Sequence, residues 1–159
     1  MKIKYVCPLI AVEDIQKSRK FYEDVLKHEV EMDHGANVAF KCGFAIHDAA
    51  HYQGLLGESY PIDIRVKKNF LELYFESEDL NRLQEKLDSI NTKFLHRIQE
   101  QPWGQRVMRF YDPDGYIIEV GEPLEFVVRR FAQQGFSLKE ISQKSSMPLE
   151  FVETVLDQK

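Results

Sequence analysis

The chain has 159 residues, of which 43% are hydrophobic, enough for one domain with a core and a small appendage. A net charge of −5 without a Lys/Arg stripe argues against a nucleic-acid surface. The only two cysteines, Cys7 and Cys42, are too few for a disulfide scaffold and favour a reducing cytosol. The first apolar run, residues 5–12, is too short to span a membrane. We therefore expect a cytoplasmic protein without membrane or nucleic-acid partners.

The first half of the chain predicts a strand, a helix and three further strands. Residues 5–12 form an apolar run typical of a buried strand. Asp14 is a suitable N-cap for a helix that continues to Leu26. Short strands are expected over residues 28–33, 37–41 and 44–47. The glycines and proline within residues 51–66 indicate a connector.

The second half predicts the same order again. Residues 70–75 alternate as a strand, which places Phe70, Glu72 and Tyr74 on one face. Asp79 caps a second helix, and two or three strands follow between residues 93 and 120. Cys7 precedes Asp14 by seven residues, as Glu72 precedes Asp79 by seven. We interpret this as a duplicated βαβββ unit; the alternative is a coincidence between two ordinary strand-to-helix junctions.

Two glutamates stand out because each lies within an apolar strand. A hairpin turn, Asp112-Pro113-Asp114-Gly115, leads into the strand 116–120, which contains Glu119. Glu72 lies within the strand 70–75. A carboxylate is costly to bury unless a metal ion or a cationic partner compensates its charge. The alternative is that both side chains lie on a solvated outer face.

The end of the chain predicts a helical tail. A helix over residues 124–134 is stopped by Gly135, and Ser137 with Glu140 forms a capping box for the next helix. Pro148 marks the start of a third. Residues 137–156 are similar to helix-turn-helix units of regulators, but the last helix is acidic and poorly suited to phosphates. We expect a packing element, which divides the chain into a domain, 1–122, and an extension, 123–159.

Three segments, residues 9–26, 70–83 and 106–122, together resemble the vicinal oxygen chelate superfamily. It includes glyoxalase I, extradiol dioxygenases, fosfomycin-resistance proteins and bleomycin-binding proteins. The resemblance implies an α+β fold in which paired βαβββ modules form an open, curled mixed sheet around a cleft, followed here by the helical tail. It also implies a homodimer and a divalent metal ion at the centre of the cleft.

The resemblance carries a metal site onto Cys7, His47, Glu72 and Glu119, with His51 as a backup ligand. Cys7 is alternatively a small buried residue of the core. Dioxygenases of the superfamily use two histidines and one carboxylate, and the matching trio here (Cys7, Glu72 and Glu119) contains no histidine. Dioxygenase and fosfomycin-resistance activities are therefore disfavoured.

The glyoxalase I pattern fits these residues better. The expected function is a lyase or isomerase that uses Zn, Ni, Mn or Fe to bind a small α-oxygenated substrate and stabilise an enediolate, with Glu72 and Glu119 as catalytic residues. The alternative is a protein without a cofactor that binds a small molecule in the absence of metal, as bleomycin-binding relatives do.

Four further residues are candidates for contact with a substrate: Arg106, Trp103, Phe70 and Tyr74. A guanidinium can hold a carboxylate or phosphate in a bidentate manner, and aromatic rings provide flat apolar walls. Each has a plainer interpretation. Arg106 could pair with Glu100 or another acid on the surface, and the aromatic side chains could be ordinary packing residues.

Overall fold

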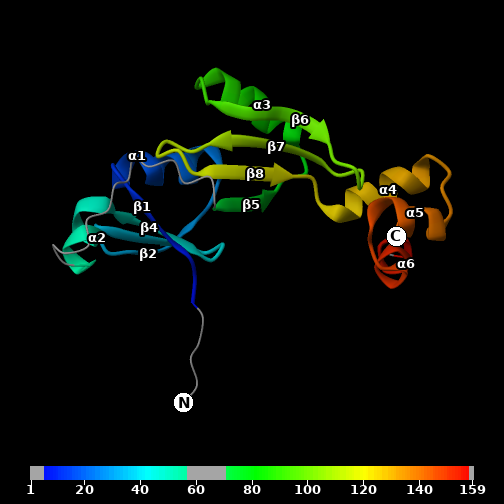
Figure 1. Ribbon diagram of the computed structural model, residues 1–159, viewed down its shortest axis with the longest axis horizontal. Helices are drawn as coiled ribbons and strands as arrows, with labels where there is room; N and C mark the ends of the chain where they lie inside the picture. Colours follow the sequence, from blue (N-terminus) through cyan, green and yellow to red (C-terminus); the bar gives the residue numbers. More distant parts are fainter. Residues whose placement is uncertain (1–5, 57–70, 158–159) are drawn as a thin grey trace, which may run out of the picture. The chain divides into compact units, whose positions relative to one another are not determined.

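The computed structural model describes residues 6–56 and 71–157, and it confirms the predicted α+β class. Two four-stranded mixed sheets each arise from a βαβββ segment, and three helices follow them in the chain (Figure 1). The chain forms two compact units. The first contains the residues up to Leu71 together with Asp112–Tyr116, and the second contains Glu72–Tyr111 and the residues from Ile117 onward. The cleft and the division at residue 122 stay predictions.

The first unit contains one sheet with the strand order β1-β4-β3-β2. Strand β1 pairs in parallel with β4, whereas β4, β3 and β2 are antiparallel. In chain order its elements are β1 (Leu9–Val12), α1 (Ile15–Lys20), the π-helix η1 (Phe21–Val25), β2 (Val30–Asp33), β3 (Asn37–Phe40), β4 (Phe44–Asp48) and α2 (Ala49–Leu56).

The first helix begins where the sequence predicts. The Asp14 side chain accepts hydrogen bonds from the amides of Gln16 and Lys17, both at 3.0 Å, so it satisfies donors that the helix leaves unpaired. The helix continues as η1, in which Tyr22 is fully buried. The Tyr22 ring lies edge-on to Phe44, with ring centroids 4.9 Å apart. These aromatic contacts form the core between the helix and the sheet.

The turn Asp112–Tyr116, which joins the last two strands of the chain, belongs to the first unit. The Tyr22 hydroxyl donates to Asp112 at 2.7 Å, and the Tyr116 hydroxyl donates to the carbonyl of Ala11 at 2.9 Å. Asp112 also accepts from the amides of Asp114 and Tyr116. Burial raises the pKa of Asp112 to about 6. The turn therefore completes the core of a unit far from it in sequence.

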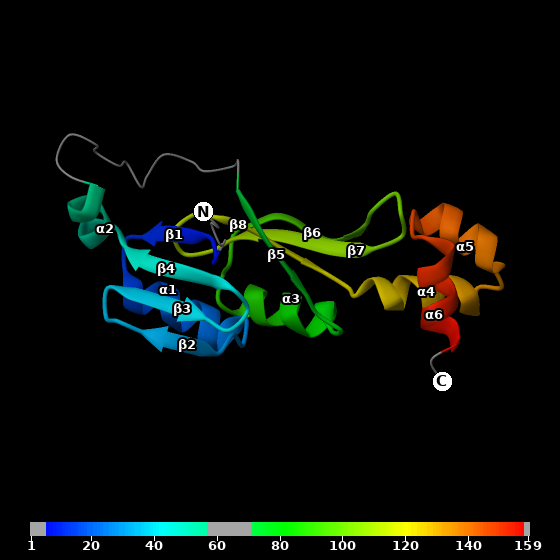
Figure 2. The same cartoon turned by 90° about the horizontal axis from the view of Figure 1, so that it is seen from below.

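The second unit repeats the topology with the strand order β5-β8-β7-β6, in which β5 and β8 are parallel. Its elements are β5 (Glu72–Glu76), α3 (Leu80–Ser89), β6 (Phe94–Glu100), β7 (Arg106–Tyr111) and β8 (Ile117–Gly121). Asp79 caps α3 by accepting from the amide of Arg82 at 3.0 Å. Seen from below, α3 lies beside the sheet of this unit (Figure 2).

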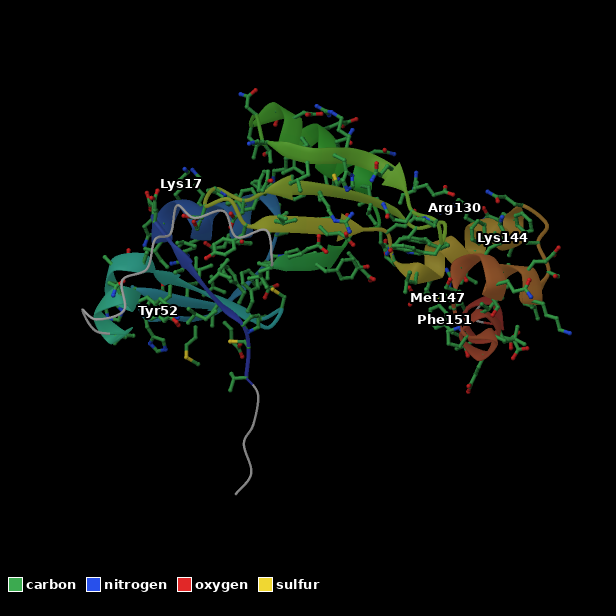
Figure 3. All side chains as sticks on the ribbon, viewed as in Figure 1. Lys17, Tyr52, Arg130, Lys144, Met147 and Phe151 are labelled. Carbon is green, nitrogen blue, oxygen red and sulfur yellow. The ribbon has the colours of Figure 1, made fainter. Side chains whose placement is uncertain are left out.

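The tail has the three predicted helices: α4 (Leu124–Gln133), α5 (Leu138–Ser145) and α6 (Leu149–Asp157). The capping box of Ser137 and Glu140 is confirmed. The helices share an apolar core of their own, formed by Val127, Val128, Phe131, Ile141, Val152 and Val155. Lys144, labelled in Figure 3, lies over the rings of Phe131 and Phe136 at 5.6 and 4.7 Å.

Two local predictions were wrong. Helix α2 occupies the first part of the expected connector 51–66, whose remainder lies outside the described residues together with Phe70. Strand β1 begins at Leu9, so Cys7 precedes the strand instead of lying on it. Within the described ranges, no helix combines the length and the apolar character needed to cross a bilayer.

Candidate functional site

Glu119 lies on β8 directly opposite Arg109 of β7. Alternation along β8 puts Ile118 and Val120 on the other, buried face of the sheet. The Glu119 carboxylate is only 7% exposed and forms an ion pair with the guanidinium of Arg109. The same guanidinium donates through Nε to Oε2 of Glu72 at 2.8 Å. Arg109 therefore joins the two glutamates that the sequence singles out.

A histidine completes this cluster. His96 of β6 has its Nδ1 2.9 Å from the carbonyl of Arg97, so Nδ1 carries the proton and donates it. Its Nε2 is then an acceptor, and Nη1 of Arg109 lies 3.1 Å from it. One guanidinium thus contacts side chains from β5, β6 and β8. We call Glu72, His96, Arg109 and Glu119 the arginine cluster.

The arginine cluster does not fit a divalent metal ion. Carboxylate ligands must offer free oxygen lone pairs to a metal, and here the positive charge between Glu72 and Glu119 is already that of Arg109. Across the described ranges, no three His, Cys, Asp or Glu side chains gather in a way that could hold a metal ion. The buried carboxylate that we predicted to need a metal or a cationic partner has the cationic partner.

The first unit holds a different polar cluster around His47 of β4. Asn37 Nδ2 lies 3.2 Å from His47 Nδ1, and since the amide nitrogen can only donate, this ring nitrogen accepts. The opposite nitrogen, Nε2, then donates to Nδ1 of His51 at 2.7 Å. The two rings stack with centroids 5.0 Å apart, and Tyr52 (labelled in Figure 3) lies 5.6 Å from His47. Burial, followed by the neighbouring His51, lowers the pKa of His47.

The backup ligand His51 reaches His47 because helix α2 starts at Ala49, directly after the strand. The sequence alone favours a strand that runs into a loop here, and so underestimates this contact. Cys7 is half-buried and belongs to the same unit. The four-ligand set of Cys7, His47, Glu72 and Glu119 as a whole stays a prediction.

Two of the candidate substrate residues, Tyr74 and Trp103, meet through Gln105. The Gln105 side chain is 4% exposed; its Nε2 donates to the Tyr74 hydroxyl at 3.0 Å, and its Oε1 accepts from the Trp103 indole at 3.0 Å. The Tyr74 hydroxyl in turn donates to Glu76 at 2.8 Å. Tyr74 is opposite Glu119 in the strand register, so it shares the sheet face of the arginine cluster.

Arg106 lies elsewhere. It is the first residue of β7, and alternation places it on the face opposite to that of Arg109. Its Nε donates to Glu122 at 3.0 Å, and Glu122 is 2% exposed. The pairing with an acid, foreseen as its plainer interpretation, is therefore present, whereas the contact with a substrate stays a prediction.

Reasoning from the sequence missed Arg109 and Gln105. A signal for Arg109 was present in the hairpin: counting five residues in either direction from Asp114 reaches Arg109 and Glu119, which are cross-strand partners. Among the described residues, the only nearby partner of the Gln105 side chain is Trp103, and its other two partners, Tyr74 of β5 and Glu122 directly after β8, are too far away in the sequence to give a local signal.

Comparison with known proteins gives the family. The model of the glyoxalase-like domain matches residues 5–125, so the chain belongs to the glyoxalase-like family. A solved structure of a protein of unknown function from Agrobacterium tumefaciens is 35% identical, covers 77% of this chain and 96% of its own, and superimposes with a TM-score of 0.69. No functionally curated protein matches the chain.

More distant structures support the fold alone. A glyoxalase/bleomycin resistance protein/dioxygenase from Nocardioides is 16% identical with a TM-score of 0.60, and the match covers 77% of this chain and 85% of that one. A lactoylglutathione lyase from Agrobacterium tumefaciens is 20% identical with a TM-score of 0.56, and the match covers 76% and 95%. The vicinal oxygen chelate fold is thereby confirmed.

Proposed function

We propose that this protein is a metal-free, small-molecule-binding member of the glyoxalase/bleomycin resistance superfamily. The observation that carries the proposal is the guanidinium of Arg109 between Glu72 and Glu119. A bound metal would compete with this cation for the same carboxylates, and displacing a partly buried ion pair costs free energy. The ligand-binding surface is the sheet face that carries the arginine cluster and Tyr74.

The polar groups on this face suit a neutral or polar organic ligand. Arg109 is 26% exposed as a side chain, so ligand atoms can reach its edge while Glu119 stays covered. His96 and Glu72 add further hydrogen-bonding groups, and the exposed ring of Tyr74 adds apolar surface. Such a set orients a ligand through hydrogen bonds, with no Lewis acid needed.

Elemental analysis tests the proposal. Purified protein is incubated with Zn, Ni, Mn or Fe(II) salts in turn, passed through a desalting column and analysed beside Glu119→Gln. We expect substoichiometric metal in both proteins. One bound metal ion per chain in the wild type, lost in the Glu119→Gln variant, would overturn the proposal.

A second candidate, the metal-dependent lyase or isomerase of the glyoxalase I type, is favoured by the His47–His51 pair. Neutral imidazoles are good ligands for Zn and Ni, and burial keeps His47 neutral near pH 7 by lowering its pKa. In this candidate Arg109 would have to leave Glu72 and Glu119 before the carboxylates could act as ligands or as a base. The same analysis distinguishes the candidates, since only the second predicts stoichiometric metal.

A further inference from the structure

We propose that Gln105 is a positioning residue of the ligand-binding face, and that helix α4 of the tail holds the Gln105 loop in place through Arg130 and Phe131. The inference rests on the proposed function, because it assigns the tail to the binding of the same ligand. In this proposal the three helices of the tail contribute to ligand binding, because they hold the loop that contains Gln105.

The hydrogen bonds of Gln105 show why it can set the position of two aromatic side chains. Its Nε2 donates both to the Tyr74 hydroxyl, at 3.0 Å, and to the carbonyl of Glu122, at 2.8 Å. Its Oε1 accepts from Trp103. The absence of a side chain at Gly121 allows this approach, since a Cβ there would lie 2.8 Å from Nε2. The buried amide thus fixes the polar end of each ring.

Helix α4 contacts the loop one residue before Gln105. The ring of Phe131 lies directly against Gly104, and a Cβ added to Gly104 would collide with that ring. Arg130, labelled in Figure 3, donates through Nη2 to the carbonyl of Gly104. Phe131 is itself a core residue of the three-helix tail. The loop is therefore held by a helix that cannot move without disturbing the tail.

Glu122 ties the same contacts to the sheet. Its carboxylate is almost fully buried, and it pairs with Nη1 of Arg130 at 2.5 Å and with Nε of Arg106 at 3.0 Å. Separating either arginine from the Glu122 carboxylate is costly, because it leaves part of a buried charge uncompensated. Loop, sheet and tail consequently meet at Glu122 and Gln105.

Trp103 is the only tryptophan of the chain, so its fluorescence reports on this loop alone. The experiment compares full-length wild type with Gln105→Leu, Arg130→Gln and Arg130→Lys, using acrylamide quenching and the emission maximum of the native protein. Arg129→Gln, an exposed neighbour on the same helix, is the matched control. Unfolding midpoints are measured in parallel, since a merely structural role would lower them without changing native Trp103.

We expect the open population of the loop to rise about fivefold in Gln105→Leu and Arg130→Gln, with a red-shifted emission and faster quenching. Arg130→Lys should fall between, because an ammonium keeps the charge but cannot bridge Glu122 and Gly104 as a planar fork does. Arg129→Gln should match the wild type.

Native quenching that is the same in all five proteins would overturn the inference, as would equal changes in Arg129→Gln and Arg130→Gln. Should Arg130→Gln fail to fold, Gly104→Ala is compared with Gly135→Ala as its control. Both glycines have a positive φ (+86° and +88°), but of the two only Gly104 faces Phe131, so only Gly104→Ala should change the quenching of Trp103. Since no readout here depends on metal content, a failed outcome is separable from failure of the proposed function.

Discussion

The two units treat their buried carboxylates in opposite ways. In the first unit, Asp112 accepts hydrogen bonds from a hydroxyl and two backbone amides, and burial raises its pKa to about 6 although these hydrogen bonds act to lower it. In the second unit, Glu119 and Glu122 are each paired with arginine side chains. Asp112 and Glu119 belong to one hairpin, so local sequence does not distinguish them. What distinguishes them is the partner that the fold brings.

The last strands of the two units make the same point. Strand β4 places His47 opposite Asn37, and β8 places Glu119 opposite Arg109. A neutral donor thus faces a neutral imidazole, and a cation faces an anion. The same strand topology therefore holds a neutral pair in the first unit and an ion pair in the second, and this ion pair uses a carboxylate onto which the family resemblance carries a metal ligand.

The largest effect is expected from removing residues 123–159, because the tail supplies Arg130 and Phe131, which contact Glu122 and Gly104 of the second unit. The truncation leaves the buried Glu122 without Arg130. We expect this to lower the free energy of unfolding by on the order of 3 kcal/mol. Light scattering should show aggregation or a changed assembly relative to full-length protein, which we expect to be a homodimer. Unchanged assembly together with loss of a salt-sensitive DNA affinity would contradict the packing role of the tail.

Next in size is Arg109→Gln, which leaves a mostly buried carboxylate without its cation. We expect a loss of about 2–3 kcal/mol in the free energy of unfolding, measured by urea denaturation. The double variant Arg109→Gln/Glu119→Gln should recover part of the loss, since no charge is then left unpaired. Asn37→Ala, the equivalent cross-strand change in the first unit, should cost only about 1 kcal/mol.

Asp112→Asn tests the neutral arrangement through pH. Because the folded-state pKa of Asp112 is raised from 3.8 to about 6, its stabilising contribution is complete below pH 4 and is lost as the pH rises to 6. The variant should therefore gain stability relative to wild type between pH 4 and pH 7, on the order of 2 kcal/mol. A difference that is constant with pH would show that Asp112 titrates normally.

The smallest effect is expected for His51→Ala. It removes one hydrogen bond and one ring contact from His47, which together contribute about 1 kcal/mol to the free energy of unfolding. Thermal denaturation beside Tyr52→Phe, which keeps the ring near His47, is sufficient to measure it. If His51→Ala lowered the free energy of unfolding as much as Arg109→Gln does, the histidine pair would be a major stabilising contact of the first unit.

The sequence predicted what local chemistry determines. Asp14, Asp79 and Ser137 begin helices because each side chain pairs with amides two or three residues away. Helix α2 was missed because Gly54 weakens the helical pattern of the sequence, and because the helix is stabilised by a contact with β4, between His51 and His47.

Long-range partners were beyond the sequence. Asp112 accepts a hydrogen bond from Tyr22, 90 residues away, and Gln105 donates one to Tyr74, 31 residues away. The sequence identifies Glu72 and Glu119 as unusual, since the negative charge of a carboxylate in an apolar strand needs a compensating partner. The identity of the compensating cation depends on strand register, and so it required the structure.

In the proposed function, Arg109 takes the place of a metal ion between Glu72 and Glu119, and titration calorimetry with Ni²⁺ and Mn²⁺ tests this role. The measurement compares wild type, Arg109→Gln and Arg109→Gln/Glu119→Gln, with Arg97→Gln as control because the Arg97 side chain pairs with Asp88, whereas its contact with the cluster, at His96, is made by its backbone carbonyl. We predict negligible binding to wild type and to the control, binding to Arg109→Gln, and loss of that binding in the double variant. Stoichiometric binding to wild type that Arg109→Gln leaves unchanged would show that Arg109 does not take the place of a metal ion.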